Sequence, residues 1–138
     1  MPNWTKEQED AIYKDGTNII VSAGAGSGKT AVLSERVLRK LKGGVNIDEL
    51  LILTFTKAAA AEMKERIRKK ISKETSLKEQ LDKIDNAYIT TFDSFALSIL
   101  KKYSHLLNVS KNVSIIEQSI IDLKKEEIID DLFEQLYG

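Results

Sequence analysis

The chain has 138 residues, of which 42% are hydrophobic, so it can bury one core, and this length favours a single domain. The absence of cysteine excludes disulfides, thiolate metal sites and a cysteine nucleophile, and the single histidine, His105, leaves little basis for histidine chemistry. Residues 1–10 are polar, and no stretch approaches the roughly 20 apolar residues of a membrane helix. We therefore expect a cytoplasmic protein with no membrane partner.

The charges cancel overall but are unevenly placed. Residues 57–83 have an excess of Lys and Arg, whereas residues 117–138 have an excess of Asp and Glu. The basic segment permits a polyanionic partner such as a nucleic acid. The alternative, which is more usual for a lysine-rich helix, is that these side chains are only solvated.

The first predicted helix begins in the segment WTKEQEDAI, residues 4–12. Thr5 and Gln8 have the S/T-x-x-E/Q spacing of a capping box, which predicts a helix with Ile12 facing inward. A second interpretation is that the Gln8 amide, which has both a donor and an acceptor, contacts the edge of an adenine base. The spacing alone favours the capping role.

The next segment, NIIVSAGAGSGKT, predicts a strand over residues 18–23, then a glycine-rich loop, then a helix that ends at Gly43 and Gly44. Each glycine costs roughly 0.5–1 kcal/mol in ordered backbone, so three at alternate positions indicate that the loop needs their conformational freedom. Such a loop can turn its N–H groups inward, and the helix adds the positive end of its dipole. The segment therefore predicts a phosphate-binding site.

The loop fits the pattern G-x-x-x-x-G-K-[ST], except that Ala23 stands at the first glycine position, where the need is for a small side chain. Lys29 is expected to reach the β and γ phosphates of ATP, and the Thr30 hydroxyl to coordinate Mg²⁺, so both are catalytic candidates. A tight turn with an incidental Lys and Thr would not explain the alternating glycines. The nucleotide-binding candidates in the loop are Ala23, Gly24, Ala25, Gly26, Ser27, Gly28, Lys29 and Thr30.

Two more strand–helix pairs follow in the chain. Strands are predicted over residues 50–55 and 87–92, helices over 58–71, 77–84, 93–107 (with Asp93 as its N-cap) and 117–137. This alternation predicts an α/β fold with a parallel sheet covered on both faces. Ligands of such sheets bind at the carboxyl ends of the strands. The segments SAGAGSGKT, TFTK and TTFDS are therefore expected to meet at one edge.

Four segments in this order, WTKEQEDAI, VSAGAGSGKT, LTFTKAAAAEMKERI and AYITTFDSFALSIL, resemble the N-terminal motor domain of superfamily 1A (UvrD/Rep-like) DNA helicases. Within that superfamily they are similar to the AddA-type component of the AddAB (RexAB) helicase-nucleases, over about residues 3–110. The resemblance implies a three-layer P-loop NTPase (RecA-like) fold, ATP and Mg²⁺ as cofactors, and DNA translocation in recombinational repair of double-strand breaks. It also implies that Gln8 contacts adenine and that Ala23 is usual in this loop.

The resemblance further implies that single-stranded DNA contacts the segments after the second and third strands. The candidate residues are Thr54, Phe55, Thr56, Lys57, Thr91, Phe92 and Ser94. Phe55 and Phe92 would stack on bases, which contributes roughly 1–3 kcal/mol per base; the alternative is that both rings belong to the core. Lys57 replaces an Asn of the relatives and would strengthen a phosphate contact. Asp93 replaces a His, and because phosphate repels a carboxylate, Asp93 is not a DNA candidate.

ATP hydrolysis in this family also needs an Asp-Glu pair at the end of a further strand and arginines from a second motor domain. Asp48 and Glu49 precede a strand and so lie at the wrong edge, while Asp130 and Asp131 have helical spacing. We therefore expect a piece of a longer helicase that binds ATP without appreciable turnover of its own. Its partners would be DNA, the remaining helicase and nuclease domains, and a second subunit of the AddB (RexB) type. An uncovered sheet edge would also favour self-association.

Two other function classes share part of this pattern. A small nucleotide kinase has the same loop, but it predicts arginines clustered in a mobile lid and gives no reason for TFTKAAAAEM. A non-enzymatic module that binds nucleotide or single-stranded DNA would differ by the dependence of its DNA affinity on salt and ATP.

Overall fold

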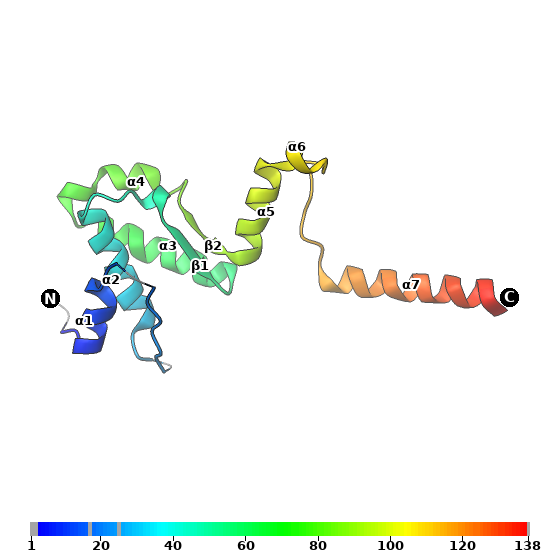
Figure 1. Cartoon of the computed structure of the whole chain (residues 1–138), viewed down its shortest axis with the longest axis horizontal. Helices are drawn as coiled ribbons and strands as arrows, with labels where there is room; N and C mark the ends of the chain where they lie inside the picture. The colour runs from blue at the N-terminus through cyan, green and yellow to red at the C-terminus, as the bar shows by residue number, and fades with distance from the viewer. Residues whose placement is uncertain (1–2, 17, 25, 138) are drawn as a thin grey trace. The chain divides into compact units, whose positions relative to one another are not determined.

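A computed structural model describes residues 3–16, 18–24 and 26–137 (Figure 1). The chain divides into two compact units, Met1–Phe92 and Asp93–Gly138, whereas its length favours a single domain. The elements of the first unit are α1 (Lys6–Tyr13), α2 (Lys29–Lys42), η1 (Ile47–Glu49), β1 (Leu51–Thr54), α3 (Lys57–Ile71), η2 (Thr75–Leu77), α4 (Glu79–Lys83) and β2 (Tyr88–Thr91). The helices predicted over 58–71 and 77–84, and the one that ends at Gly43, are confirmed.

The main core of the first unit lies between α2, α3 and the two strands. On α3, Met63, Ile67 and Ile71 recur every four residues and face inward, as expected for one apolar stripe of a helix. The buried residues of this main core are Val37, Leu38, Leu41, Ile47, Ile52, Met63, Ile67, Ile71, Leu77, Ile84 and Ile89. They fix the helices against the sheet.

The sheet consists, in the described residues, of β1 and β2, which run parallel in a register that pairs Leu51 with Tyr88 and Thr54 with Thr91. The carboxyl ends of the two strands therefore lie side by side, as predicted for TFTK and TTFDS (Figure 1). Ile52 and Ile89 point into the main core. On the other face Leu53 remains exposed, so the prediction of a sheet covered on both faces is wrong for the first unit taken by itself.

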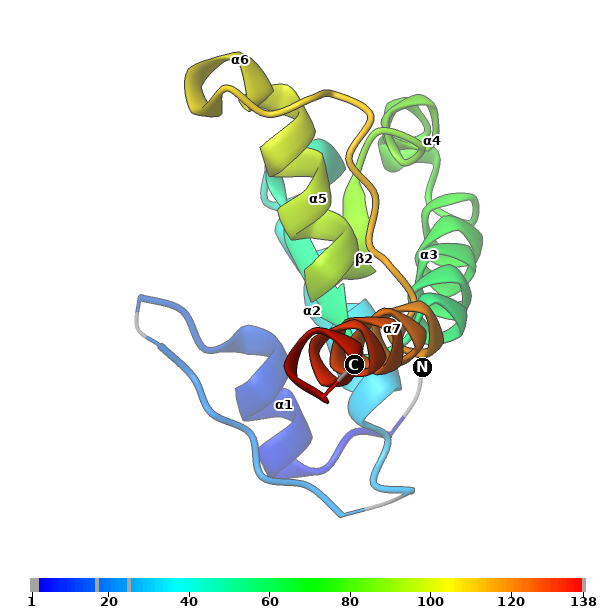
Figure 2. The ribbon, with the colours of Figure 1, turned by 90° about the vertical axis from the view of Figure 1, so that its right-hand side faces the viewer.

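Residues 18–23, which were expected to form a strand, run as an extended segment with no strand assignment (Figure 2). A strand exists only where a neighbour accepts and donates the ladder hydrogen bonds, and in the described residues β1 pairs only with β2. Ile20 is 96% exposed and Val21 is also exposed. The sequence had the apolar character of a buried strand, but this chain supplies no pairing partner for it.

A second, smaller cluster joins α1 to α2. Ala11 and Ile12 of α1 pack against Val32 of α2, and Trp4 covers them from the side. This cluster is separate from the main core, so α1 is held mainly by α2. The helix predicted from the capping box, with Ile12 inward, is confirmed.

The second unit begins within α5 (Phe92–Lys102) and contains α6 (Ser104–Leu107) and α7 (Gln118–Tyr137). Asp93 was predicted as the N-cap of α5 but lies inside its first turn, because β2 passes into the helix without an intervening loop. A carboxylate in a first turn still interacts favourably with the helix dipole. The helix predicted over 117–137 is confirmed as α7, on which Ile128, Leu132 and Leu136 are exposed. None of the helices described is both long and apolar enough to cross a membrane.

Candidate nucleotide-binding site

The glycine-rich loop has the backbone conformation that its sequence requires. Gly26 and Gly28 have φ angles of +76° and +82°, a region that side chains with a Cβ atom rarely adopt. Gly28 is the N-cap of α2 and supplies no side-chain cap, so the first-turn N–H groups of α2 are directed toward the loop. Ala25, one of the candidates, lies outside the described residues. The loop thus has the form of an anion site at a helix N-terminus.

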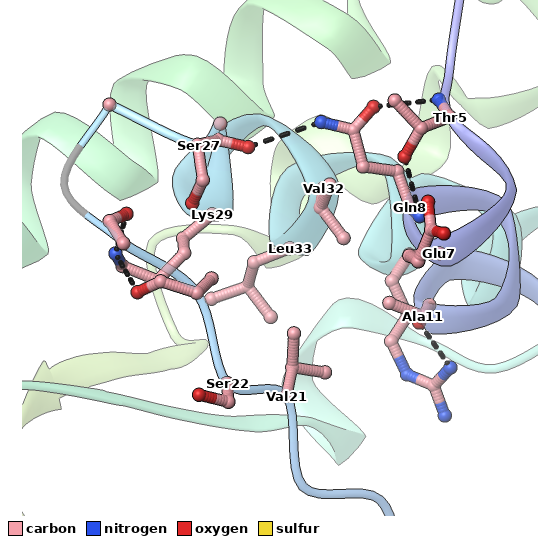
Figure 3. Close-up of a pocket in the computed structure, with 15 residues that line it drawn as sticks. Thr5, Glu7, Gln8, Ala11, Val21, Ser22, Ser27, Lys29, Val32 and Leu33 are labelled. Carbon is pink, nitrogen blue, oxygen red and sulfur yellow. Dashed lines mark hydrogen bonds between the residues drawn. The ribbon is translucent and has the colours of Figure 1, made fainter.

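Lys29 bends back over this loop (Figure 3). Its Nζ donates hydrogen bonds to the carbonyl oxygens of Ala23, at 2.8 Å, and Gly24, at 2.6 Å. The ammonium group is therefore held above the concave side of the loop. A phosphate bound there would meet a positive charge that is already in place.

Gln8 performs the capping role and also reaches the loop. Its Oε1 accepts from the Thr5 backbone N–H at 3.0 Å, and the Thr5 hydroxyl accepts from the Gln8 N–H at 3.3 Å, which confirms the capping box. Its Nε2 donates to the Ser27 carbonyl at 3.1 Å (Figure 3). Gln8 is thus placed at the loop, where the resemblance puts the adenine contact, and the two roles are compatible.

Two open cavities flank the loop. The larger, of about 890 Å³, extends from the loop between α1 and residues 21–24. Its lining is largely apolar, with Val21, Val32 and Leu33 beside Gln8 and Lys29 (Figure 3). Such a cavity, apolar with a few polar groups, is typical of small-molecule sites.

The smaller cavity, of about 280 Å³, lies on the side of the loop that faces α3. Residues 26–31 line it together with Arg66, which also pairs with Glu62 at 2.7 Å. Sequence reasoning missed Arg66, although its segment KERI belongs to the third of the motifs and follows the strand that ends beside the site. Thr30, the Mg²⁺ candidate, lines the same cavity.

Acidic groups near the site are few. Glu7 lines the larger cavity, and its own backbone N–H, followed by the Thr5 hydroxyl, holds the pKa of this carboxyl below its usual range. No group of three or more His, Cys, Asp or Glu side chains is placed to hold a metal ion in the ranges that the structure describes. A Mg²⁺ ion would therefore depend on Thr30 and on the phosphates themselves.

The segment after β1 presents an aromatic ring to solvent. Phe55 is 104% exposed, and Phe92, after β2, is 68% exposed, so the alternative that both rings belong to the core is wrong. Thr56 is the N-cap of α3, where its hydroxyl accepts from the Ala59 N–H at 3.1 Å. The Thr54 hydroxyl donates to the Thr56 carbonyl at 3.0 Å. Lys57 follows as an exposed residue at the start of α3.

The candidates at the end of β2 differ in accessibility. Thr91 is buried and Ser94 is half-buried, whereas Phe92 projects into solvent. The adjacent tips of β1 and β2 therefore offer an aromatic ring each, and the hydroxyl groups after β2 are less accessible than its ring.

The basic segment 57–83 is largely neutralised by ion pairs. Lys64 and Arg68 both contact Asp85, at 3.1 and 2.7 Å, and lower the pKa of its carboxyl. Lys70 pairs with Glu35 of α2. This favours the interpretation of a paired and solvated helix surface over that of a general polyanion site.

The two acidic pairs considered for hydrolysis lie where the sequence placed them. Asp48 and Glu49 belong to η1, which precedes β1 and so lies at the amino end of the strand. Asp130 and Asp131 lie within α7. Neither pair follows a strand of the described sheet.

Comparisons with known proteins agree with the motif order. A family model described as the UvrD/REP helicase N-terminal domain matches residues 4–137. Three relatives are named as the first of the two subunits, the A-type, of an ATP-dependent helicase/nuclease. Those from Oceanobacillus iheyensis and Clostridium novyi are 45% and 46% identical, over 100% and 97% of this chain. The one from Heliobacterium modesticaldum is 43% identical over 99% of this chain.

The chain is much shorter than these relatives. It spans only about 12%, 12% and 10% of the lengths of the proteins from Oceanobacillus iheyensis, Clostridium novyi and Heliobacterium modesticaldum. The family model, in contrast, covers nearly all of the chain. The chain therefore belongs to the UvrD/REP helicase N-terminal domain family.

Proposed function

We propose that this chain is the ATP-binding portion of an ATP-dependent DNA helicase/nuclease that unwinds DNA in recombinational repair of double-strand breaks. The observation that carries the proposal is the glycine loop at the N-terminus of α2, with Lys29 held over it and Gln8 bonded to it. The relatives' names, which designate an ATP-dependent helicase/nuclease, support the same activity. A second subunit and further helicase and nuclease domains would complete the enzyme, which we expect in the cytoplasm.

In this proposal each residue of the loop has a defined role. The N–H groups of residues 23–30 bind the phosphates of ATP, Lys29 neutralises the β and γ phosphates, and Thr30 coordinates Mg²⁺. Gln8 contacts adenine. Residues 18–23 would form a strand of a three-layer P-loop NTPase (RecA-like) fold, because their exposed apolar side chains fit a sheet interior.

The tips of β1 and β2 form the proposed contact with single-stranded DNA. Phe55 and Phe92 offer exposed faces on which bases can stack, and Lys57 with the N-terminus of α3 can contact phosphate. The other candidates, Thr54, Thr56, Thr91 and Ser94, belong to the same two segments. Stacking is tolerant of sequence, so we expect little preference among DNA sequences.

Calorimetric titration of the purified chain with Mg·ATP tests the nucleotide site. We expect binding that Lys29→Ala weakens by at least about tenfold, because a charge-assisted contact to phosphate is lost. Lys42→Ala is the matched control, since Lys42 lies on the same helix but pairs with Glu74. Absence of binding by the unsubstituted chain would refute the proposal.

Two further assays separate the alternatives. The chain should show no steady ATP hydrolysis and no phosphoryl transfer to a nucleoside monophosphate; transfer would support a nucleotide kinase instead. Phe55→Ala should weaken single-stranded DNA binding by roughly five- to a hundredfold, the equivalent of one lost stacking contact. Phe133→Ala, which removes an exposed ring of α7, is the control.

A further inference from the structure

The far end of α1 is bound to α2 by a cluster of charged side chains that the nucleotide chemistry does not use. Arg36 of α2 donates from one guanidinium nitrogen, Nη1, to the carbonyl oxygens of Ala11 at 2.9 Å, Ile12 at 3.3 Å and Lys14 at 2.9 Å. These carbonyls belong to the last turn of α1 and the residue after it, where intrahelical donors are lacking. A side chain of a neighbouring helix thus caps α1.

Other side chains of α2 strengthen this cap. Arg39 stacks over the Tyr13 ring at 5.4 Å and pairs with Asp15 at 2.7 Å, and Lys40 also contacts Asp15 at 2.5 Å. The hydrogen bonds from Arg39 and then Lys40 lower the pKa of Asp15 to about 2, so this carboxylate is ionised at neutral pH. Positive charge at a helix C-terminus is also favourable to the dipole of α1.

The cap matters because little else holds α1 in place. The apolar contact between α1 and α2 consists of Ala11, Ile12 and Val32, with Trp4 at its side. At the other end of α1, Gln8 touches the loop through a single hydrogen bond to the Ser27 carbonyl. Gln8 lies one turn before Ile12 on a short, stiff helix, so a shift of the capped end must displace Gln8.

We propose that Arg36 is a positioning residue for base recognition: by capping α1 on α2 it holds Gln8 at the rim of the phosphate loop. The inference rests on the proposed nucleotide site and adds to it a residue that contacts protein carbonyls. Arg36 also lines the larger cavity, but its guanidinium is committed to α1. Selectivity for adenine thereby depends on an arginine two turns along α2 from the loop.

The first arm of the test measures the docking of α1 without any ligand. Trp4 is the only tryptophan of the chain and packs on the α1–α2 cluster, so its emission reports this contact. Arg36→Met keeps an apolar stem but removes the donors; we expect a red shift of Trp4 emission and stronger quenching by acrylamide. Lys42→Met, the same charge change on the same helix away from α1, should leave both unchanged. Unchanged Trp4 emission in Arg36→Met with native circular dichroism would overturn the proposal.

The second arm compares Mg·ATP with Mg·tripolyphosphate, which lacks the base. Arg36→Met should weaken ATP binding by roughly three- to tenfold, the equivalent of about one hydrogen bond, with tripolyphosphate binding changed less than about twofold. Arg36→Lys, which keeps the charge but not the fork of donors, should give a smaller loss and covers the case in which Arg36→Met fails to fold. An equal loss for both ligands would mean a general structural role and would overturn the positioning role.

A double substitution separates positioning from an independent contact. If Arg36 acts through Gln8, Arg36→Met should cost little further ATP affinity once Gln8→Ala is present. Fully additive losses would contradict the proposal. If the unsubstituted chain bound neither ATP nor tripolyphosphate, the proposed function itself would fail, and the Trp4 measurement would still decide whether Arg36 docks α1.

Discussion

The two ends of α2 lie in very different surroundings. Val37, Leu38 and Leu41, near its C-terminus, belong to the main core with α3 and both strands, whereas Val32, near its N-terminus, belongs to the small cluster with α1. Every nucleotide-binding candidate lies at the second, thinly packed end. Ligand-binding segments commonly come from the less stable parts of a fold, because binding requires them to adjust.

Substitution in the main core tests this comparison with the largest expected effect. Ile67 of α3 is 1% exposed in that core, and Ile67→Ala should lower the free energy of unfolding by about 2–5 kcal/mol through lost burial and a residual cavity. Urea denaturation followed by far-ultraviolet circular dichroism measures the loss. A loss below about 1 kcal/mol would mean that the main core does not dominate stability.

The same substitution in the small cluster should act locally. Ile12 is also fully buried, but Ile12→Ala should release α1, with a change in Trp4 emission and a decrease in global stability of less than about 2 kcal/mol, since few neighbours surround it. Ile20→Ala, at a 96% exposed position, is the control and should change neither. Equal global losses for Ile12→Ala and Ile67→Ala would show that the two regions unfold as one.

The loop itself can be strained without any change in the cores. Gly28→Ala places a Cβ in a left-handed conformation and 3.4 Å from Gln8 Nε2, so we expect a loss of about 1–2 kcal/mol and weaker Mg·ATP binding. Gly24→Ala, whose Cβ would meet open space, should cost less stability. A greater cost at Gly24 would contradict the backbone geometry described for the loop.

Acid should weaken the α1 cap before it affects the main core. The pKa of Asp15 is lowered from 3.8 to about 2, so its contribution to stability is present above about pH 4 and is lost as the pH falls toward 2. Asp15→Asn should therefore be slightly less stable than the unsubstituted chain near neutral pH, and the difference should vanish near the lowered pKa of Asp15. Trp4 emission against pH measures it, and a difference that grows toward low pH would have the wrong sign.

Local sequence signals predicted most of the elements of the first unit. The capping box, the apolar stripe of α3, the Gly43 stop and the two strands each depend on residues close together in the chain, and each is found. Residues 18–23 failed because a strand also needs a partner, which periodicity cannot supply. Asp93 failed because the spacing cannot tell whether a loop residue separates β2 from α5.

The candidate site was predicted where a motif has a fixed backbone meaning. Gly26 and Gly28 have positive φ angles, and Gln8 reaches Ser27 as well as capping α1. Arg36 and Arg66 had no such signal, since an arginine on a helix is usually a surface residue. Their roles follow only from which helix lies beside them, which is a tertiary property.

The junction between β1 and α3 has a consequence for any partner that binds there. Only Phe55 and Thr56 separate strand from helix, and hydrogen bonds from Thr54 to Thr56 and from Ala59 to Thr56 fix the backbone on the helix side of the ring. The entropy of ordering this turn has been spent during folding, so an incoming ring would meet a preorganised platform and would immobilise little more than one side-chain rotor.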